Sequence, residues 1–186
     1  MICGIDYGSK MSGTTSICFL EGDEIKFKRS VKKEDADRMI LDFCKAYKPE
    51  LIAIDAPLSL PGVYQGLGGF DNYFYRKCDV ELKAMSPMFL GGLTARAMKL
   101  KSQMPQVRFI EAYPVAYARR LDFEKWSYRK ESPDYSKMIT SLGVQLTDAI
   151  ETTHDFDALL CHQIAISFLN QTVEVAGDQS EGLIYY

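Results

Sequence analysis

The first twenty residues constrain the fold of this chain more than any other stretch. Their sequence, ICGIDYGSKMSGTTSICFL over residues 2–20, predicts a short apolar strand at 2–6, a glycine-rich turn and a second strand at 14–20. Asp6 lies where the first strand ends. Three glycines allow tight turning, or close approach of a ligand to the backbone: Gly4, Gly8 and Gly13. The pattern predicts a place that can hold a metal ion or a phosphate.

The next elements follow in an order that specifies a mixed sheet. Glu21-Gly22-Asp23 predicts a hairpin turn into a third strand at 24–30, and the period then changes to that of an amphipathic helix over 33–47. LIAID at 51–55 is a continuous apolar run typical of a buried parallel strand, and it ends in a second acid, Asp55. Three antiparallel strands followed by a β-α-β crossover predict one α/β domain with helices on the faces of the sheet.

The rest of the chain alternates between loops, helices and one further strand. Residues 56–74 predict a long Pro- and Gly-rich loop, a kind of loop that often covers or contacts a substrate. Helices are expected at about 75–85, 92–103, 134–142 and 155–170. A strand is expected at 107–113, with Glu111 near its end. Residues 122–135 carry no clear signal, and the closing GLIYY is expected to form an edge segment.

The composition is that of a cytoplasmic globular protein. The 186 residues, 47% hydrophobic and 25% charged, are enough for one domain with a full core. No apolar run approaches 18 residues, and the N-terminus lacks the regions of a signal peptide, so neither a transmembrane helix nor a secretory leader is expected. The five cysteines form no CxxC pair, which predicts reduced, buried thiols rather than disulfides or a zinc site.

The charge of the chain is unevenly distributed. The net charge of −3 argues against a general nucleic-acid coat protein. Residues 76–130, however, hold 12 basic and 5 acidic side chains, a net of +7, whereas residues 131–186 hold 1 basic and 9 acidic, a net of −8. The basic segment is either a local phosphate-binding surface or a set of ordinary solvated helix faces.

Four acids are candidates for one catalytic site. Asp6, Asp55 and Glu111 lie at or near the carboxyl ends of strands, where open α/β sheets bind their ligands, and Asp157 begins the last helix. Carboxylates that converge repel one another, and a divalent cation relieves the repulsion. Oxygen ligands without histidine or cysteine favour Mg²⁺ or Mn²⁺. Two such ions can activate a water and stabilise the leaving oxygen of a phosphodiester.

Each of these acids also has a structural interpretation. Asp6 can cap the glycine turn, and Asp55 can be a turn residue before Ala-Pro. Glu111 can pair with a nearby arginine, Arg119 or Arg120, and Asp157 can be an ordinary acid of a helix N-terminus. The neighbouring His154 is interpreted as a surface histidine and His162 as a packing residue.

Six motifs in order resemble one family. They are GIDYGSK, IDAPLSLP, RKCDVEL, GGLTARAMKL, EAYP and HDFDALLCHQIA. Together, over nearly the whole chain, they look like the family of predicted nucleases catalogued as domain of unknown function 429, within the ribonuclease H-like superfamily.

The resemblance implies a fold, an activity and a set of site residues. It implies one ribonuclease H-like domain over 1–186, with a five-stranded mixed sheet, the first three strands antiparallel, helices on both faces and an insertion at about 56–104. It implies metal-dependent phosphodiester cleavage with Asp6, Asp55 and Asp157 as metal ligands and Glu111 as a further acid. The family's RxCD pair corresponds to Arg76 and Asp79. The resolvases of this superfamily carry two acids three apart on the last helix, whereas Asp155 and Asp157 are two apart and point about 200° away from each other. Asp157 is therefore the expected ligand.

Three functions remain open at the level of sequence. The leading hypothesis is a nuclease that acts on DNA or RNA and contacts substrate phosphates through a set of polar side chains: Ser9, Lys10, Arg76, Lys77, Arg96 and Arg119. The second is a nucleotide-dependent phosphotransferase or ATPase of the related actin-like fold, in which a homodimer supplies the second domain. The third is a non-catalytic nucleic-acid-binding module.

Overall fold

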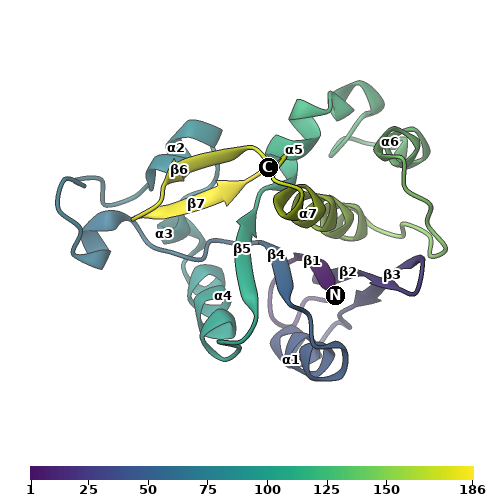
Figure 1. Cartoon of the computed structure of the whole chain (residues 1–186), viewed down its shortest axis with the longest axis horizontal. Helices are drawn as coiled ribbons and strands as arrows, with labels where there is room; N and C mark the ends of the chain where they lie inside the picture. Colours follow the sequence, from purple (N-terminus) through teal and green to yellow (C-terminus); the bar gives the residue numbers. More distant parts are fainter.

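The computed structural model describes the whole chain, residues 1–186, and its centre is a seven-stranded mixed sheet (Figure 1). The strands are β1 (Ile2–Asp6), β2 (Ser16–Glu21), β3 (Glu24–Arg29), β4 (Leu51–Asp55), β5 (Arg108–Ala112), β6 (Val175–Asp178) and β7 (Gly182–Tyr185). Their order across the sheet is β3-β2-β1-β4-β5-β7-β6. The strand β1 therefore lies inside the sheet, between β2 and β4.

Strand directions confirm the predicted α/β class. The strand β2 runs antiparallel to both β1 and β3, and β4 and β5 run parallel to β1. The first three strands thus form the antiparallel part, and the crossover through α1 (Ala36–Tyr47) brings β4 in parallel beside β1. The antiparallel pairing of the first three strands agrees with what the sequence motifs imply.

The strand count differs from the predicted five. The closing GLIYY does not form an edge, because β7 pairs in parallel with β5 on one side and antiparallel with β6 on the other. The edge strand on this side of the sheet is β6, whose sequence VAGD has no apolar alternation and includes Gly177 at φ 108°. A four-residue strand of this kind carries almost no signal in the sequence, so the hairpin was not predicted.

Helices cover both faces of the sheet. Besides α1, they are α2 (Lys77–Leu82), α3 (Pro87–Leu90), α4 (Gly92–Ser102), α5 (Pro114–Arg120), α6 (Tyr135–Leu142) and α7 (Thr153–Leu169), with 3-10 turns η1 (Gly62–Gln65) and η2 (Phe123–Trp126). In Figure 1, α7 lies over one face and α1 and α4 lie over the other. The core divides in the same way, since Cys3, Ile5 and Ile54 pack with α1 and α4 while Ala53 packs with α7. None of these helices is long and apolar enough to cross a membrane.

The helix α7 packs closely against β1 because β1 carries a glycine at the crossing. A Cβ at Gly4 would lie 2.1 Å from the backbone nitrogen of His162 and 2.3 Å from the carbonyl oxygen of Ala158. Gly4 therefore allows the backbone of α7 to approach the sheet, rather than a ligand. This close packing fixes the first turns of α7, and with them Asp157, relative to the end of β1.

Candidate active site

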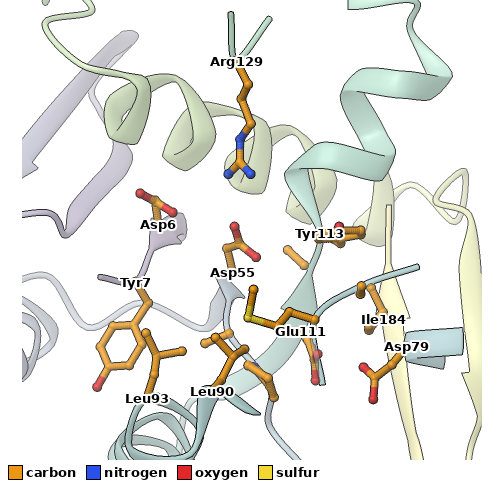
Figure 2. A pocket seen from close by; sticks show the side chains of 15 residues that line it. Asp6, Tyr7, Asp55, Asp79, Leu90, Leu93, Glu111, Tyr113, Arg129 and Ile184 are labelled. Atoms are coloured by element: carbon orange, nitrogen blue, oxygen red, sulfur yellow. The ribbon is translucent and has the colours of Figure 1, made fainter. Parts of the chain in front are cut away.

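Asp6 and Asp55 lie side by side at the carboxyl ends of the two central parallel strands. They are register partners in the β1–β4 pair, so their Cα atoms are separated by about one strand spacing, roughly 4.8 Å. Side chains of one strand alternate between the two faces of a sheet, so both carboxylates point to the face that α7 covers. Both line a pocket of about 290 Å³, shown in Figure 2.

Asp157 approaches the same carboxylates from α7. Its side chain is almost fully buried, with Tyr128 donating a hydrogen bond to Oδ1 at 2.6 Å and Arg129 donating one to Oδ2 at 2.6 Å. The negative charge of Asp157 contributes to the raised pKa of both Asp6 and Asp55, which shows that the three groups interact. The three acids that were expected as metal ligands therefore lie within electrostatic range of one another, but they are not grouped as they would be around a metal ion.

Asp55 is the least compensated of the three. Burial raises its pKa well above the usual range, and the charges of Asp6 and Asp157 raise it further. Only Arg129 acts in the opposite direction among the charges that affect it most. Asp55 receives no hydrogen bond from a neighbouring side chain, in contrast to Asp6 and Asp157. Its oxygens are therefore available to an added cation.

His154 was interpreted as a surface histidine, but in the structure its side chain contacts Asp6. Its Nδ1 is 2.6 Å from Oδ2 of Asp6. The hydrogen bond with Asp6 raises the pKa of His154, against a smaller effect of burial. Burial raises the pKa of Asp6 in turn, and the hydrogen bond with His154 opposes that increase. The imidazole is thus a partner that orients the Asp6 carboxylate.

Arg129 is the functional side chain that the sequence did not reveal. Figure 2 shows its guanidinium pointing at Asp55 from the side opposite the sheet. It comes from the segment after η2, where the backbone is left-handed at Ser127 (φ 61°), Arg129 (φ 57°) and Ser132 (φ 55°). Residues other than glycine rarely adopt this conformation, and the residue types at these positions do not predict it. The pKa of Arg129 is raised because Asp157 and Tyr128 outweigh the effect of burial.

Glu111 lines the same pocket as Asp6 and Asp55, but its side chain lies on the opposite face of the sheet from theirs. It is the register partner of Ile54, one position before Asp55. A shift of one residue turns a side chain to the opposite face of the sheet, and Figure 2 shows Glu111 pointing away from Asp55. There, both of its oxygens accept hydrogen bonds from Arg76 at 2.7 Å, and Oε2 also accepts one from the backbone of Leu58 at 2.9 Å.

Arg76 is a buried structural residue, so its expected contact with substrate phosphates does not fit its position. Its side chain is 0% exposed. The guanidinium donates to Glu111, to both oxygens of Asp79 at 2.7 and 3.1 Å, and to Ser59 at 2.9 Å. These acids raise the pKa of Arg76 despite burial, so it stays charged. The RxCD motif therefore joins α2 to β5, and Glu111 pairs with Arg76 instead of Arg119 or Arg120.

None of the other expected phosphate contacts lines this pocket, and they differ in exposure and pairing. Arg96 is held by Asp37 at 2.6 Å and by the carbonyl oxygen of Gly8, so it connects α4 to the glycine turn. Lys10 forms an ion pair with Asp35 at 3.0 Å and is half exposed. The remaining three are exposed: Ser9, Lys77 and Arg119.

Asp155 has a structural role, in agreement with the preference for Asp157. It is fully buried and forms the capping box of α7 with Thr152. Its oxygens also accept hydrogen bonds from Ser16 at 2.7 Å and from Arg29 at 3.0 Å. Asp155 therefore attaches the start of α7 to β2 and β3.

Comparisons with known proteins add little to this geometry. No family model matches the chain, and no curated protein matches it. Among solved structures, the chain is similar to T. thermophilus RuvC, determined in complex with a Holliday junction substrate, at a TM-score of 0.45 and 15% identity, over 92% of this chain and 96% of that chain. A likeness of this size does not bear on activity, and the fold class follows from the strand order and directions described above.

Proposed function

We propose that this protein is a divalent-cation-dependent nuclease that hydrolyses phosphodiester bonds of DNA or RNA, and that it belongs to the family of predicted nucleases that its motifs resemble. The observation that carries the proposal is the set of three carboxylates on one face of the sheet, Asp6, Asp55 and Asp157, of which Asp55 accepts no side-chain hydrogen bond. All three acids come from one chain, so the activity does not require a dimer.

The chemistry of these donors fits a hard divalent cation. Carboxylate oxygens are the ligands that Mg²⁺ and Mn²⁺ prefer, and a cation would remove the repulsion that raises the pKa of Asp55 and Asp6. In the described arrangement, no three His, Cys, Asp or Glu side chains are grouped as they would be around a metal ion. In this arrangement the Arg129 guanidinium pairs with Asp157 at 2.6 Å and points at Asp55.

The residues of the chain have distinct tasks in this proposal. The bound ions would supply an activated water and stabilise the leaving oxygen. Asp6, between Asp55 and Asp157, is the expected shared ligand, and His154 holds its carboxylate in place. Tyr128 fixes Oδ1 of Asp157, while Oδ2 becomes available when Arg129 releases it. Arg129, which is already 46% exposed while it pairs with Asp157, would then contact a substrate phosphate together with the exposed side chains Ser9, Lys10, Lys77 and Arg119.

Cleavage of labelled oligonucleotides tests the proposal. Single-stranded, duplex and four-way-junction DNA, single-stranded RNA and an RNA–DNA hybrid are incubated with Mn²⁺ or Mg²⁺. We expect cleavage of at least one substrate, loss of cleavage on chelation with EDTA, and at least a hundredfold loss in Asp55→Asn. The control Asp71→Asn, which neutralises an exposed acid outside the pocket, should cleave like the wild type.

The other outcomes identify the alternatives. Binding of nucleic acid without cleavage, unchanged in Asp55→Asn, would contradict the nuclease and indicate a binding module. Hydrolysis of a nucleoside triphosphate without cleavage of any oligonucleotide would indicate the phosphotransferase or ATPase.

A further inference from the structure

The pocket beside the three acids has an apolar wall, and the proposed hydrolysis assigns no role to this wall. Nine of its fifteen lining residues are hydrophobic. Opposite Asp6 and Asp55, the wall is formed by side chains from the segment between β4 and β5, together with Tyr113 and Ile184 (Figure 2). The side chains contributed by that segment are Met85, Leu90 and Leu93. The pocket thus combines these apolar side chains with four carboxylates, those of Asp6, Asp55, Asp79 and Glu111.

The apolar wall is incompletely covered by the protein. Met85 is 61% exposed, and Leu90, Leu93 and Tyr113 are each only partly buried. Apolar side chains that face one concave pocket and lack protein neighbours are typical of a binding site. The hydrolysis of a phosphodiester requires only the acids and the cation, so the wall must serve another part of the ligand.

The same segment also carries exposed aromatic rings. Phe74 and Phe89 are 57% and 63% exposed, and their ring centroids lie 6.1 Å apart. Tyr75 packs edge-on against Phe89 at 5.7 Å. Exposed aromatic rings are the platforms on which unpaired bases stack, and the segment 76–130 that adjoins them carries a net charge of +7.

We infer that the apolar wall holds the base of an unpaired nucleotide whose phosphate lies at the carboxylates. This inference rests on the proposed function and specifies its substrate class. A pocket of about 290 Å³ is at the lower end of the range for small-molecule sites, so it accepts one nucleoside-sized group. A base within a duplex is stacked and paired, and it reaches such a pocket only when it leaves the stack. The preferred substrate is therefore a single strand, or a nucleotide displaced from a duplex.

Binding of two small probes tests this inference. Adenosine 5′-monophosphate and ribose 5-phosphate carry the same phosphate and sugar, and only the first has a base. In calorimetric titrations of the full chain with Mn²⁺ present, we expect adenosine 5′-monophosphate to bind at least about tenfold more tightly, because base stacking against apolar and aromatic side chains adds affinity.

A matched pair of variants places the effect in the pocket. Met85 and Val80 are both exposed apolar residues, 61% and 59%, of the same segment, but only Met85 lines the pocket. Met85→Ser should weaken binding of adenosine 5′-monophosphate roughly fivefold and leave the affinities for ribose 5-phosphate and Mn²⁺ unchanged. Val80→Ser should leave all three affinities unchanged.

The outcomes separate this inference from the proposed function. If Mn²⁺ binds but the two probes bind equally well, or neither probe binds, the base site is overturned and the cation site stands. If Met85→Ser and Val80→Ser weaken binding equally, the base is not held at this wall. If Mn²⁺ itself does not bind, the proposed function and this inference both fall.

Discussion

The substitution Glu111→Gln distinguishes a structural role for Glu111 from a catalytic one. Glu111 accepts two hydrogen bonds from Arg76 at 2.7 Å, and Arg76 is 0% exposed. Removing one member of a buried ion pair costs about 3–5 kcal/mol, because the other charge is left without its partner. Arg76 keeps Asp79 and Ser59 as acceptors, so the lower end, about 3 kcal/mol, is expected.

Urea denaturation, followed by circular dichroism, measures this loss. With an m-value of about 2 kcal/mol per molar urea, a loss of about 3 kcal/mol lowers the transition midpoint by roughly 1.5 M. The control is Asp55→Asn, the same acid-to-amide change on the neighbouring strand. Asp55 lacks a compensating partner and is repelled by Asp6, so its variant should be as stable as the wild type or more stable.

The two variants should therefore change stability in opposite directions. A Glu111→Gln midpoint within about 0.3 M of the wild type, accompanied by loss of cleavage, would refute the structural role and assign Glu111 to catalysis.

Three further predictions concern the site and its support. Arg129→Gln removes the guanidinium that competes for Asp157, so calorimetry should show Mn²⁺ binding about fivefold more tightly; weaker binding would mean that Arg129 supports the cation instead. Burial lowers the pKa of His162 to about 4, below the usual 6.5, so below pH 6.5 the unfolded chain binds a proton that the folded protein does not. This difference should lower the free energy of unfolding of the wild type by about 3 kcal/mol between pH 6.5 and pH 4. In His162→Leu the loss over this interval should be smaller by that amount, and equal losses would contradict the buried neutral imidazole. Gly4→Ala places a Cβ 2.1 Å from a backbone atom of α7, so urea denaturation should show a free energy of unfolding about 3 kcal/mol lower than that of the wild type. Wild-type stability would mean that α7 can move away from β1.

The sequence predicted the parts of the fold that local patterns specify. The apolar runs at 2–6 and 51–55 form the paired central strands β1 and β4, and the amphipathic period over 33–47 forms α1 (Ala36–Tyr47). The change of period between these segments implied the parallel crossover, because strands joined through a helix lie parallel. The alignment of Asp6 with Asp55 follows from both acids ending equivalent strands.

The parts that were not predicted depend on register and on backbone conformation. Asp55 ends β4 and Glu111 is the last residue but one of β5, and only the register, with Glu111 beside Ile54, shows that the two side chains face opposite ways. Arg129 reaches the acids through a segment with left-handed residues other than glycine, which no residue pattern identifies. The hairpin of β6 and β7 is stabilised by pairing with β5 rather than by the propensity of VAGD.

Titration of Mn²⁺ into the metal-free protein tests the central claim most directly. The wild type, Asp6→Asn, Asp55→Asn and the control Asp71→Asn are compared by calorimetry at one pH and one salt concentration. If the three acids hold the cation, the wild type and Asp71→Asn bind Mn²⁺, and Asp6→Asn and Asp55→Asn lose at least about tenfold in affinity. Absence of binding in the wild type, or equal binding in all four proteins, would contradict a cation site at these carboxylates.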